Sequence, residues 1–172
     1  LMWIVIAFMS GSIPWAAIAV KLISGKSVRD VGDGNPGAMN AWKSSGWLVG
    51  MGVLILEIAK SFVPIYLAMT LINEFSGVEG AIQLSLIALA PVLGHAWSPF
   101  LKFKGGKALA PSWGSWIALT NGLALPVGAI LLGILHAIQK NHAVTVTGCL
   151  LGFLVVFQLL WREDHIGIFW VM

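Results

Sequence analysis

The stretch GWLVGMGVLILEIAKSFVPIYLAMTLI, residues 46–72, contains only two charged side chains, Glu57 and Lys60. An apolar helix of roughly 20 residues crosses the hydrocarbon core of a bilayer, so this stretch predicts a membrane-spanning helix. Glu57 and Lys60 are separated by three positions and therefore lie on one face of that helix. Charged side chains inside a bilayer are candidate functional residues, although a neutralising pair that fixes helix packing is the interpretation we favour.

Apolar runs of similar character lie on both sides of this stretch. The segment 108–138 is too long for one crossing and is interrupted by Asn121, Gly122 and Pro126, so we divide it into two helices. The expected helices cover residues 1–23, 46–72, 80–97, 108–120, 123–138 and 143–160. Residues 166–172 are too short to cross, so they either lie in the membrane interface or begin another helix of a chain cut at that point. The sequence thus predicts an all-α integral membrane protein with a single membrane domain over residues 1–172.

The composition indicates that lipid is part of the solvent of this chain. Hydrophobic residues make up 58% of it, charged residues make up 10%, and the mean hydropathy is +0.90. Such a chain cannot hide its apolar surface in one water-soluble core. Cys149 is the one cysteine, which excludes an intramolecular disulfide and a thiolate metal cluster. No spacing of His, Cys and carboxylate residues suggests a metal site.

The basic residues are unevenly divided between the two membrane faces. Cytoplasmic loops carry the excess of Lys and Arg. With residues 108–138 divided, one face carries Arg162 alone, and the other carries Lys21, Lys26, Arg29, Lys43, Lys102, Lys104, Lys107 and Lys140. This distribution places two glycine-rich segments, 32–43 and 94–107, on the cytoplasmic face.

The first glycine-rich segment reads GDGNPGAMN, residues 32–40, and is followed by Lys43. Glycines let a ligand approach backbone amides closely, Asn side chains add hydrogen-bond donors, and Lys43 adds positive charge. This chemistry suits a phosphate group. Gly, Asn, Asp and Pro are also the usual turn formers, so an ordinary loop is an equally good interpretation of this segment alone.

The second segment, GHAWSPFLKFKGGK at residues 94–107, combines aromatic residues, lysines and two adjacent glycines. It could hold a phosphorylated, acylated substrate, with the head group on the amides and Lys107 and the tail in the bilayer. It is not a Walker A loop, because Leu101 replaces the first glycine and Ala108 replaces the magnesium-binding Ser or Thr. A basic membrane anchor would explain the lysines and aromatics but not Gly-Gly-Lys. His95 could donate to a phosphate or carry a proton, or it could simply orient the loop.

Together the two segments resemble the bacterial glycerol-3-phosphate acyltransferases that use acyl phosphate, the PlsY family. Gly11-Ser12-Ile13-Pro14, VGDGNPGAMN from Val31 and GHAWSPFLKFKGGKALA from Gly94 occur in the family's order, over about residues 10–115. The resemblance implies a seven-helix enzyme of the inner membrane that takes part in phospholipid synthesis. Residues 166–172 would then be the start of the seventh helix in a chain truncated at its C-terminus. Such an enzyme moves an acyl chain from acyl phosphate to the 1-hydroxyl of glycerol 3-phosphate and releases lysophosphatidic acid and inorganic phosphate. The resemblance implies no cofactor, no nucleic-acid partner, and a monomer among membrane lipids.

The resemblance also assigns site residues. It implies catalytic roles for Lys43, His95 and Lys107, and substrate binding by Gly34, Asn35, Gly37, Asn40, Lys104, Gly105 and Gly106. Glu57 and Lys60 are similar to an acidic residue and a lysine in the family's second helix. Several positions depart from the family pattern: Lys43 replaces arginine, Asp33 serine, Met39 threonine, Ala108 glycine and Pro111 threonine.

Asp33 is the most consequential of these departures, because a carboxylate beside two phosphates is repulsive unless it is neutralised. The family's His-Arg-Glu-Asn stretch near the C-terminus is missing, and residues 161–164 imitate it only loosely. Two alternatives to the acyltransferase therefore stay open. One is a family member that is not catalytic or acts on another acceptor, and the less favoured one is a small anion transporter.

Overall fold

The structure, a computed structural model, describes residues 1–72 and 75–160 of the chain. Within these residues the chain is helical and has no strand, so the predicted all-α class is confirmed. The helices are α1 (Met2–Ser12), α2 (Trp15–Ser24), α3 (Ala38–Ser45), α4 (Trp47–Leu71), α5 (Gly77–Ala96), α6 (Leu109–Leu119), α7 (Ala124–Ile138) and α8 (His142–Leu160), with short 3-10 turns η1 (Val28–Asp30) and η2 (Pro99–Leu101).

The first expected helix is in fact two helices, α1 and α2, and the expectation of one continuous helix is wrong. Pro14 has no N–H to donate, and Ile13 takes an extended conformation with φ −63° and ψ 122°. The carbonyls at the break accept hydrogen bonds from other elements: Ser98 Oγ donates to Ser12 over 2.6 Å, and Lys60 Nζ donates to Ile13 over 2.9 Å. The break therefore ties α1 to α4 and to the second glycine-rich segment.

The division of residues 108–138 into two helices is confirmed. Asn121 and Gly122 separate α6 from α7, and both have positive φ angles, 50° and 91°. Pro126 does not take part in the break. It lies in the first turn of α7, where its missing N–H has no partner within the helix anyway.

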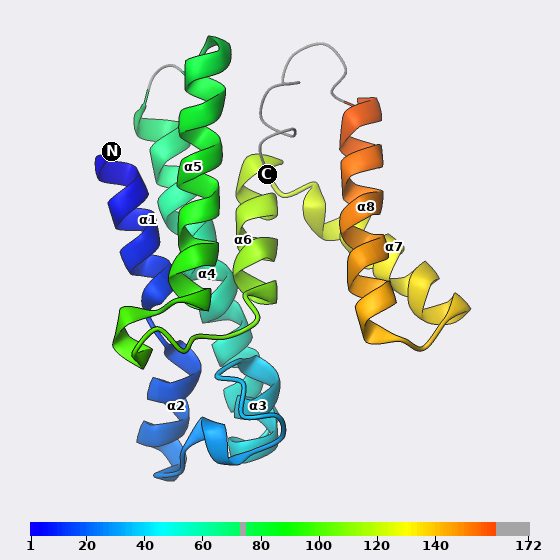
Figure 1. The fold of residues 1–172 in the computed structure, drawn as a ribbon. Coiled ribbons are helices and arrows are strands. Elements are labelled where there is room, and N and C mark those ends of the chain that lie inside the picture. The colour runs from blue at the N-terminus through cyan, green and yellow to red at the C-terminus, as the bar shows by residue number, and fades with distance from the viewer. Residues whose placement is uncertain (73–74, 161–172) are drawn as a thin grey trace.

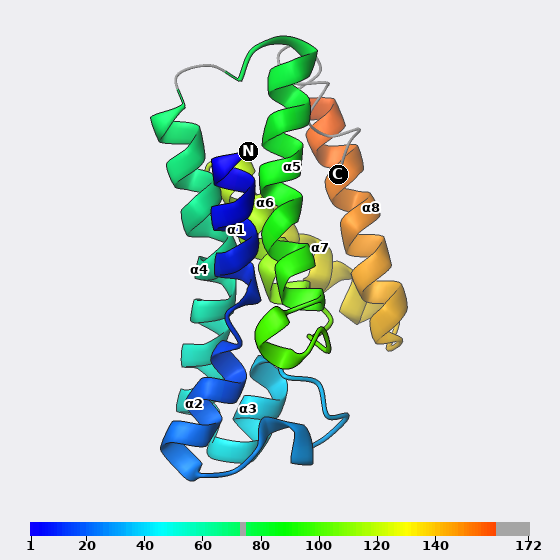
Figure 2. The same cartoon turned by 60° about the vertical axis from the view of Figure 1, so that its left-hand side comes forward.

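Figure 1 shows α1, α4, α5 and α6 side by side, with α7 and α8 beyond α6, and Figure 2 shows the same arrangement after a 60° turn. Because the chain reverses between α4, α5, α6, α7 and α8, three connections lie in the lower half of the molecule in Figure 1. These are the segment with η1 and α3, the α5–α6 loop and the α7–α8 loop. Both glycine-rich segments therefore lie at one end, as expected, because two helices of opposite direction, α4 and α5, separate them in the sequence.

Small residues let the helices approach one another closely. A side-chain carbon added to any of three glycines would fall 2.2 Å from a backbone oxygen of a neighbouring helix: Gly11 against Pro91, Gly94 against Phe8, and Gly114 against Ile58. In a bilayer the lipid tails are as apolar as the helix faces, so close packing contributes most to helix association. These contacts fix α5 on α1 and α6 on α4, and thereby position the loop between α5 and α6.

Among the described residues, three stretches are long and apolar enough to cross a membrane: Met2–Ser24, Trp47–Leu71 and Gly77–Leu101. Helix α6 has 11 residues and rises about 16 Å, which is roughly half of a hydrocarbon core. The apolar helices Ala124–Leu135 and Val144–Leu159 are also shorter. The expected count of six crossings is therefore not established by helix length. The expected start of a seventh helix and Arg162 lie outside the described residues.

Candidate functional site

The two glycine-rich segments meet at a contact between Asn35 and Lys107. The backbone N–H of Lys107 donates to Asn35 Oδ1 over 3.2 Å, although 72 positions separate the two residues in sequence. Asn35 follows Gly34, whose φ of +70° is a left-handed conformation that favours glycine. The prediction that the two segments form one site is thus consistent with their direct contact.

Asp33 connects to both segments through its carboxylate. Its Oδ2 lies 2.7 Å from Lys107 Nζ, while its Oδ1 accepts from Asn40 Nδ2 over 2.8 Å and from the Asn35 N–H over 3.2 Å. The hydrogen bond from Lys107, followed by those from Asn40 and Asn35, holds the pKa of Asp33 well below its usual range. Asp33 is therefore an anion that neutralises part of the positive charge at this site.

Two helix N-termini lie beside the Asn35–Lys107 contact. Gly37 is the N-cap of α3 and Ala108 is the N-cap of α6, each within two positions of one of the contacting residues. Neither N-cap residue supplies a capping hydrogen bond from its side chain, because glycine and alanine have no side-chain acceptor. The N–H groups of a first helical turn carry partial positive charge and have no partner within the helix, so both ends are suited to an anion.

Behind the loops, Glu57, Lys60 and His95 form a buried polar cluster. The Lys60 and Glu57 side chains, 2% and 1% exposed, form an ion pair with Nζ and Oε2 2.7 Å apart. His95 Nδ1 lies 2.9 Å from Lys60 Nζ and 3.0 Å from Glu57 Oε2. The favoured interpretation of Glu57 and Lys60 as a neutralising pair agrees with this geometry, and His95 is its additional member.

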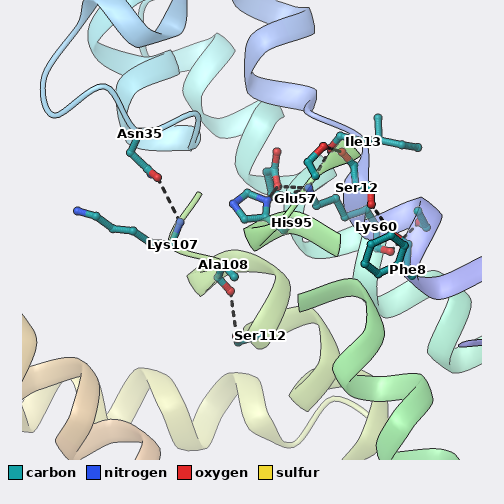
Figure 3. Close-up of polar contacts among 12 residues, drawn as sticks. Phe8, Ser12, Ile13, Asn35, Glu57, Lys60, His95, Lys107, Ala108 and Ser112 are labelled. Carbon is teal, nitrogen blue, oxygen red and sulfur yellow. Dashed lines mark hydrogen bonds and ion pairs between the residues drawn. The ribbon is translucent and has the colours of Figure 1, made fainter. Parts of the chain in front are cut away.

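His95 lies between the buried pair and the Asn35–Lys107 contact (Figure 3). A side-chain carbon added to Gly106 would fall 2.4 Å from His95 Nε2 and 3.0 Å from Asn35 Oδ1. The imidazole and the Asn35 side chain therefore approach the same point. A side chain at position 106 would fill this point, and glycine leaves it open. His95 Nε2 faces the loops, while Nδ1 faces the ion pair.

The backbone amides of Gly105 and Gly106 form hydrogen bonds within the protein, whereas the sequence analysis expected the amides of this loop to hold a substrate head group. The Gly105 N–H donates to Ala96 O over 3.1 Å, and the Gly106 N–H donates to His95 O over 3.2 Å. Both amides thus pair with carbonyls at the C-terminal end of α5 and are not directed at the helix N-termini. Lys43 and Lys104 have exposed side chains that form no hydrogen bond or ion pair within the described part of the chain.

One basic residue that contacts both segments was not singled out from the sequence. The Arg29 guanidinium donates to the carbonyl of Lys104 and, over 3.5 Å, to the carbonyl of Gly34. The sequence analysis counted Arg29 only as one of the charges of a cytoplasmic face. Its position five residues before Gly34 gave no signal that it reaches the other segment.

The whole chain, residues 1–172, matches the protein family described as Glycerol-3-phosphate acyltransferase. Glycerol-3-phosphate acyltransferase 1 of Thermotoga maritima is 39% identical over 145 residues, which cover 83% of this chain and 70% of that protein. Glycerol-3-phosphate acyltransferase 1 of Dehalococcoides mccartyi is 32% identical over 168 residues, which cover 95% of this chain and 77% of that protein.

Two crystal structures of PlsY, an integral membrane glycerol 3-phosphate acyltransferase, have a similar fold. The glycerol 3-phosphate form aligns over 98% of this chain and 81% of that one, with a TM-score of 0.81 and 24% identity. The lysophosphatidic acid form aligns over 99% and 81%, with a TM-score of 0.75 and 25% identity. The resemblance inferred from the glycine-rich segments is confirmed: this multi-pass membrane protein belongs to the glycerol-3-phosphate acyltransferase family, as a PlsY-type acyltransferase.

Proposed function

We propose that this chain transfers a fatty acyl group from acyl phosphate to the 1-hydroxyl of glycerol 3-phosphate, giving lysophosphatidic acid and inorganic phosphate. Both substrates are phosphorylated, and one carries an acyl tail that belongs in the bilayer. The observation that carries the proposal is the contact between Asn35 and Lys107, each of which lies within two positions of a helix N-cap, Gly37 of α3 and Ala108 of α6. Such helix ends bind phosphate groups.

In the proposed reaction, the hydroxyl oxygen of glycerol 3-phosphate forms a bond to the carbonyl carbon of acyl phosphate. The bond between that carbon and the bridging phosphate oxygen then breaks, and phosphate leaves. Phosphate is a good leaving group, so no protein nucleophile is required. The hydroxyl proton goes either to a phosphate oxygen of the substrates or to His95. The main task of the protein is to hold two anions together and to stabilise developing negative charge.

We assign the binding of the two anions and the stabilisation of negative charge to the basic residues and the helix N-termini. Lys107 and Lys43 would stabilise charge in the transition state, and Lys104 would bind a substrate phosphate. Lys43 lies on α3 three positions after Asn40, on the same side of the helix, and its exposed ammonium is free to contact an anion at these loops. Gly34, Gly37, Gly105 and Gly106 would shape the loops around the substrates.

We place the site on the cytoplasmic face of the inner membrane. The eight basic residues assigned to one face in the sequence belong to the three connections in the lower half of Figure 1 or to the helix ends beside them. Basic loops stay in the cytoplasm, which supports this orientation.

The test is an assay of the purified protein in lipid with acyl phosphate and glycerol 3-phosphate. Formation of lysophosphatidic acid is expected, and Lys107→Ala should reduce turnover about 100-fold, the usual loss for a residue that stabilises transition-state charge. Lys140→Ala is the matched control, since Lys140 lies in the α7–α8 loop, outside both glycine-rich segments. Full turnover of Lys107→Ala would show that the phosphate site is placed wrongly.

Asp33 favours a second candidate, the acylation of a different acceptor. Its carboxylate forms an ion pair with Lys107, 2.7 Å from Nζ, and would repel the phosphate of glycerol 3-phosphate. An acceptor alcohol with less negative charge would avoid this repulsion. The same assay with glycerol in place of glycerol 3-phosphate distinguishes the two candidates by the product formed.

A further inference from the structure

The buried ion pair of Glu57 and Lys60 has one feature that its role in helix packing does not require. Its Lys60 ammonium lies 2.9 Å from His95 Nδ1, while Nε2 of the same ring faces Gly106 and the loops. The pair lies within the membrane-spanning helix α4, and His95 lies in the last turn of the membrane-spanning helix α5. A buried charge pair is thus connected to the proposed acyl-transfer site through one imidazole ring (Figure 3).

The contacts of Lys60 determine which nitrogen of His95 carries the proton. An ammonium group has three N–H donors and no acceptor. Three acceptors surround Lys60 Nζ: Glu57 Oε2 at 2.7 Å, Ile13 O at 2.9 Å and His95 Nδ1 at 2.9 Å. For the third contact to be a hydrogen bond, Nδ1 must present its lone pair. In a neutral imidazole the proton is then on Nε2.

The opposite tautomer is disfavoured by the same distances. A proton on Nδ1 could reach Glu57 Oε2 at 3.0 Å, but it would place an N–H donor 2.9 Å from the Lys60 ammonium. Two donors would then face each other in a site where the Lys60 and Glu57 side chains are 2% and 1% exposed. Water does not reach such a site to compensate for an unmade hydrogen bond, so that arrangement is costly.

We propose that Glu57 and Lys60 are positioning residues that hold neutral His95 with its proton on Nε2, so that His95 donates a hydrogen bond into the acyl-transfer site. What His95 contacts there rests on the proposed function. The Nε2–H is directed to the point beside Gly106 that Asn35 also approaches, where a substrate phosphate or the developing oxyanion would accept it. His95 in this state has no lone pair toward the substrates. The hydroxyl proton therefore goes to a phosphate oxygen and not to His95.

The first test measures the tautomer without any turnover. Protein with ¹⁵N-labelled histidine is examined by NMR in lipid, and the His95 signals are identified by their loss in His95→Gln. A protonated Nε2 and an unprotonated Nδ1 are expected. In Lys60→Met, which has no donor, the proton should move to Nδ1 and bind Glu57. Ser61→Ala is the control, because Ser61 is fully buried on the same helix but its Oγ has no partner among the described residues.

A proton on Nδ1 in the unaltered protein, or an unchanged tautomer in Lys60→Met, would overturn the proposal. This result does not depend on whether the protein transfers acyl groups. If Lys60→Met does not fold, the unaltered protein still gives a decisive spectrum.

The second test uses turnover, with lysophosphatidic acid as the product measured. The amide nitrogen of Gln can occupy the position of Nε2–H, whereas that of Asn corresponds to Nδ1–H. His95→Gln should keep kcat within about tenfold, and His95→Asn and His95→Ala should lose about 100-fold, as expected on removal of one oxyanion donor. Equal losses in all three variants would contradict a donor role. Absence of product in the unaltered protein would instead refute the proposed function and leave the NMR result standing.

Discussion

Lys107 Nζ lies 2.7 Å from Asp33 Oδ2, while the backbone N–H of the same lysine donates to Asn35 over 3.2 Å. The ammonium group proposed to hold a substrate phosphate is therefore already paired with a carboxylate of the other glycine-rich segment. Both side chains are largely exposed, 66% for Lys107 and 53% for Asp33, so water screens the pair. A substrate phosphate can compete with Asp33 for Lys107, but the carboxylate remains close enough to repel it.

Asp33→Ser should lower the KM for glycerol 3-phosphate. The substitution removes both the competition of Asp33 for Lys107 and its repulsion of the substrate phosphate. Because an exposed ion pair is weak, we expect the KM to fall by only about fivefold. The measurement is steady-state kinetics with acyl phosphate held saturating. Asp30→Ser is the matched control, because Asp30 is exposed in η1 and makes no side-chain contact with Lys107. An unchanged or higher KM in Asp33→Ser would show that the carboxylate helps to bind the acceptor.

The low pKa of Asp33 predicts that the ion pair persists in mild acid. A carboxyl group whose pKa is lowered on folding stabilises the folded state above its ordinary pKa of 3.8 and loses this contribution only as the pH falls through the lower folded value. Asp33 should therefore remain ionised at pH 4, and pH effects on activity near neutrality should arise elsewhere. A ¹³C NMR titration of labelled aspartate checks this. In Lys107→Met the midpoint should rise toward 3.8, and a midpoint already at that value in the unaltered protein would contradict the prediction.

The sequence was sufficient to predict the membrane class and most helix positions, because about 20 apolar residues between polar breaks are a strong local signal. The break at Ile13 and Pro14 was missed, since the apolar composition continues across it. Its stability depends on Ser98 and Lys60, which pair with the freed carbonyls from distant parts of the chain. Such long-range pairing is not visible in a hydropathy pattern.

For the site, the residue types predicted a phosphate-binding surface, and the resemblance identified the same two segments. The ion pair of Asp33 was not predicted, because a carboxylate and a lysine 74 positions apart give no local signal. The same holds for the contact of Arg29 with Lys104. Periodicity did place Glu57 and Lys60 on one face, but it could not show that His95 completes the cluster.

Arg29→Met should loosen the contact between the two segments. The Arg29 guanidinium donates to the carbonyls of Lys104 and Gly34, so its loss frees both loops without removing a group that touches the reacting atoms. We expect the KM for both substrates to rise severalfold, with kcat changed by less than about threefold, because exposed contacts of this kind contribute little individually. Lys26→Met is the control for the loss of one exposed positive charge. Equal effects of the two variants would mean that only net charge matters.

Gly106→Ala and Gly105→Ala should fail in different ways. A side-chain carbon on Gly106 would meet His95 Nε2 at 2.4 Å, so the ring must turn away and kcat should fall about 100-fold with the fold retained. A carbon on Gly105 would lie 1.8 Å from the backbone oxygen of His95, which cannot move alone. That variant should lose about 1–3 kcal/mol of folding stability. Turnover and thermal unfolding of both variants, measured in one detergent, separate these outcomes, and similar profiles for the two would contradict the assignment.

Gly114→Ala should weaken the packing of α6 on α4. This packing positions the N-terminus of α6, which begins at the N-cap residue Ala108. The added carbon would fall 2.2 Å from Ile58 O, a backbone atom inside α4, so the two helices must separate. We expect a loss of about 1–3 kcal/mol, as for other overpacked sites. Gly52→Ala is the matched control, because Gly52 is also within a helix but has no atom within 4 Å of the added carbon. Within a helix, alanine is more favourable than glycine by up to about 1 kcal/mol, so Gly52→Ala should leave the stability unchanged or raise it. If thermal unfolding gives both variants the same midpoint, close contact between α4 and α6 does not limit the stability of the site.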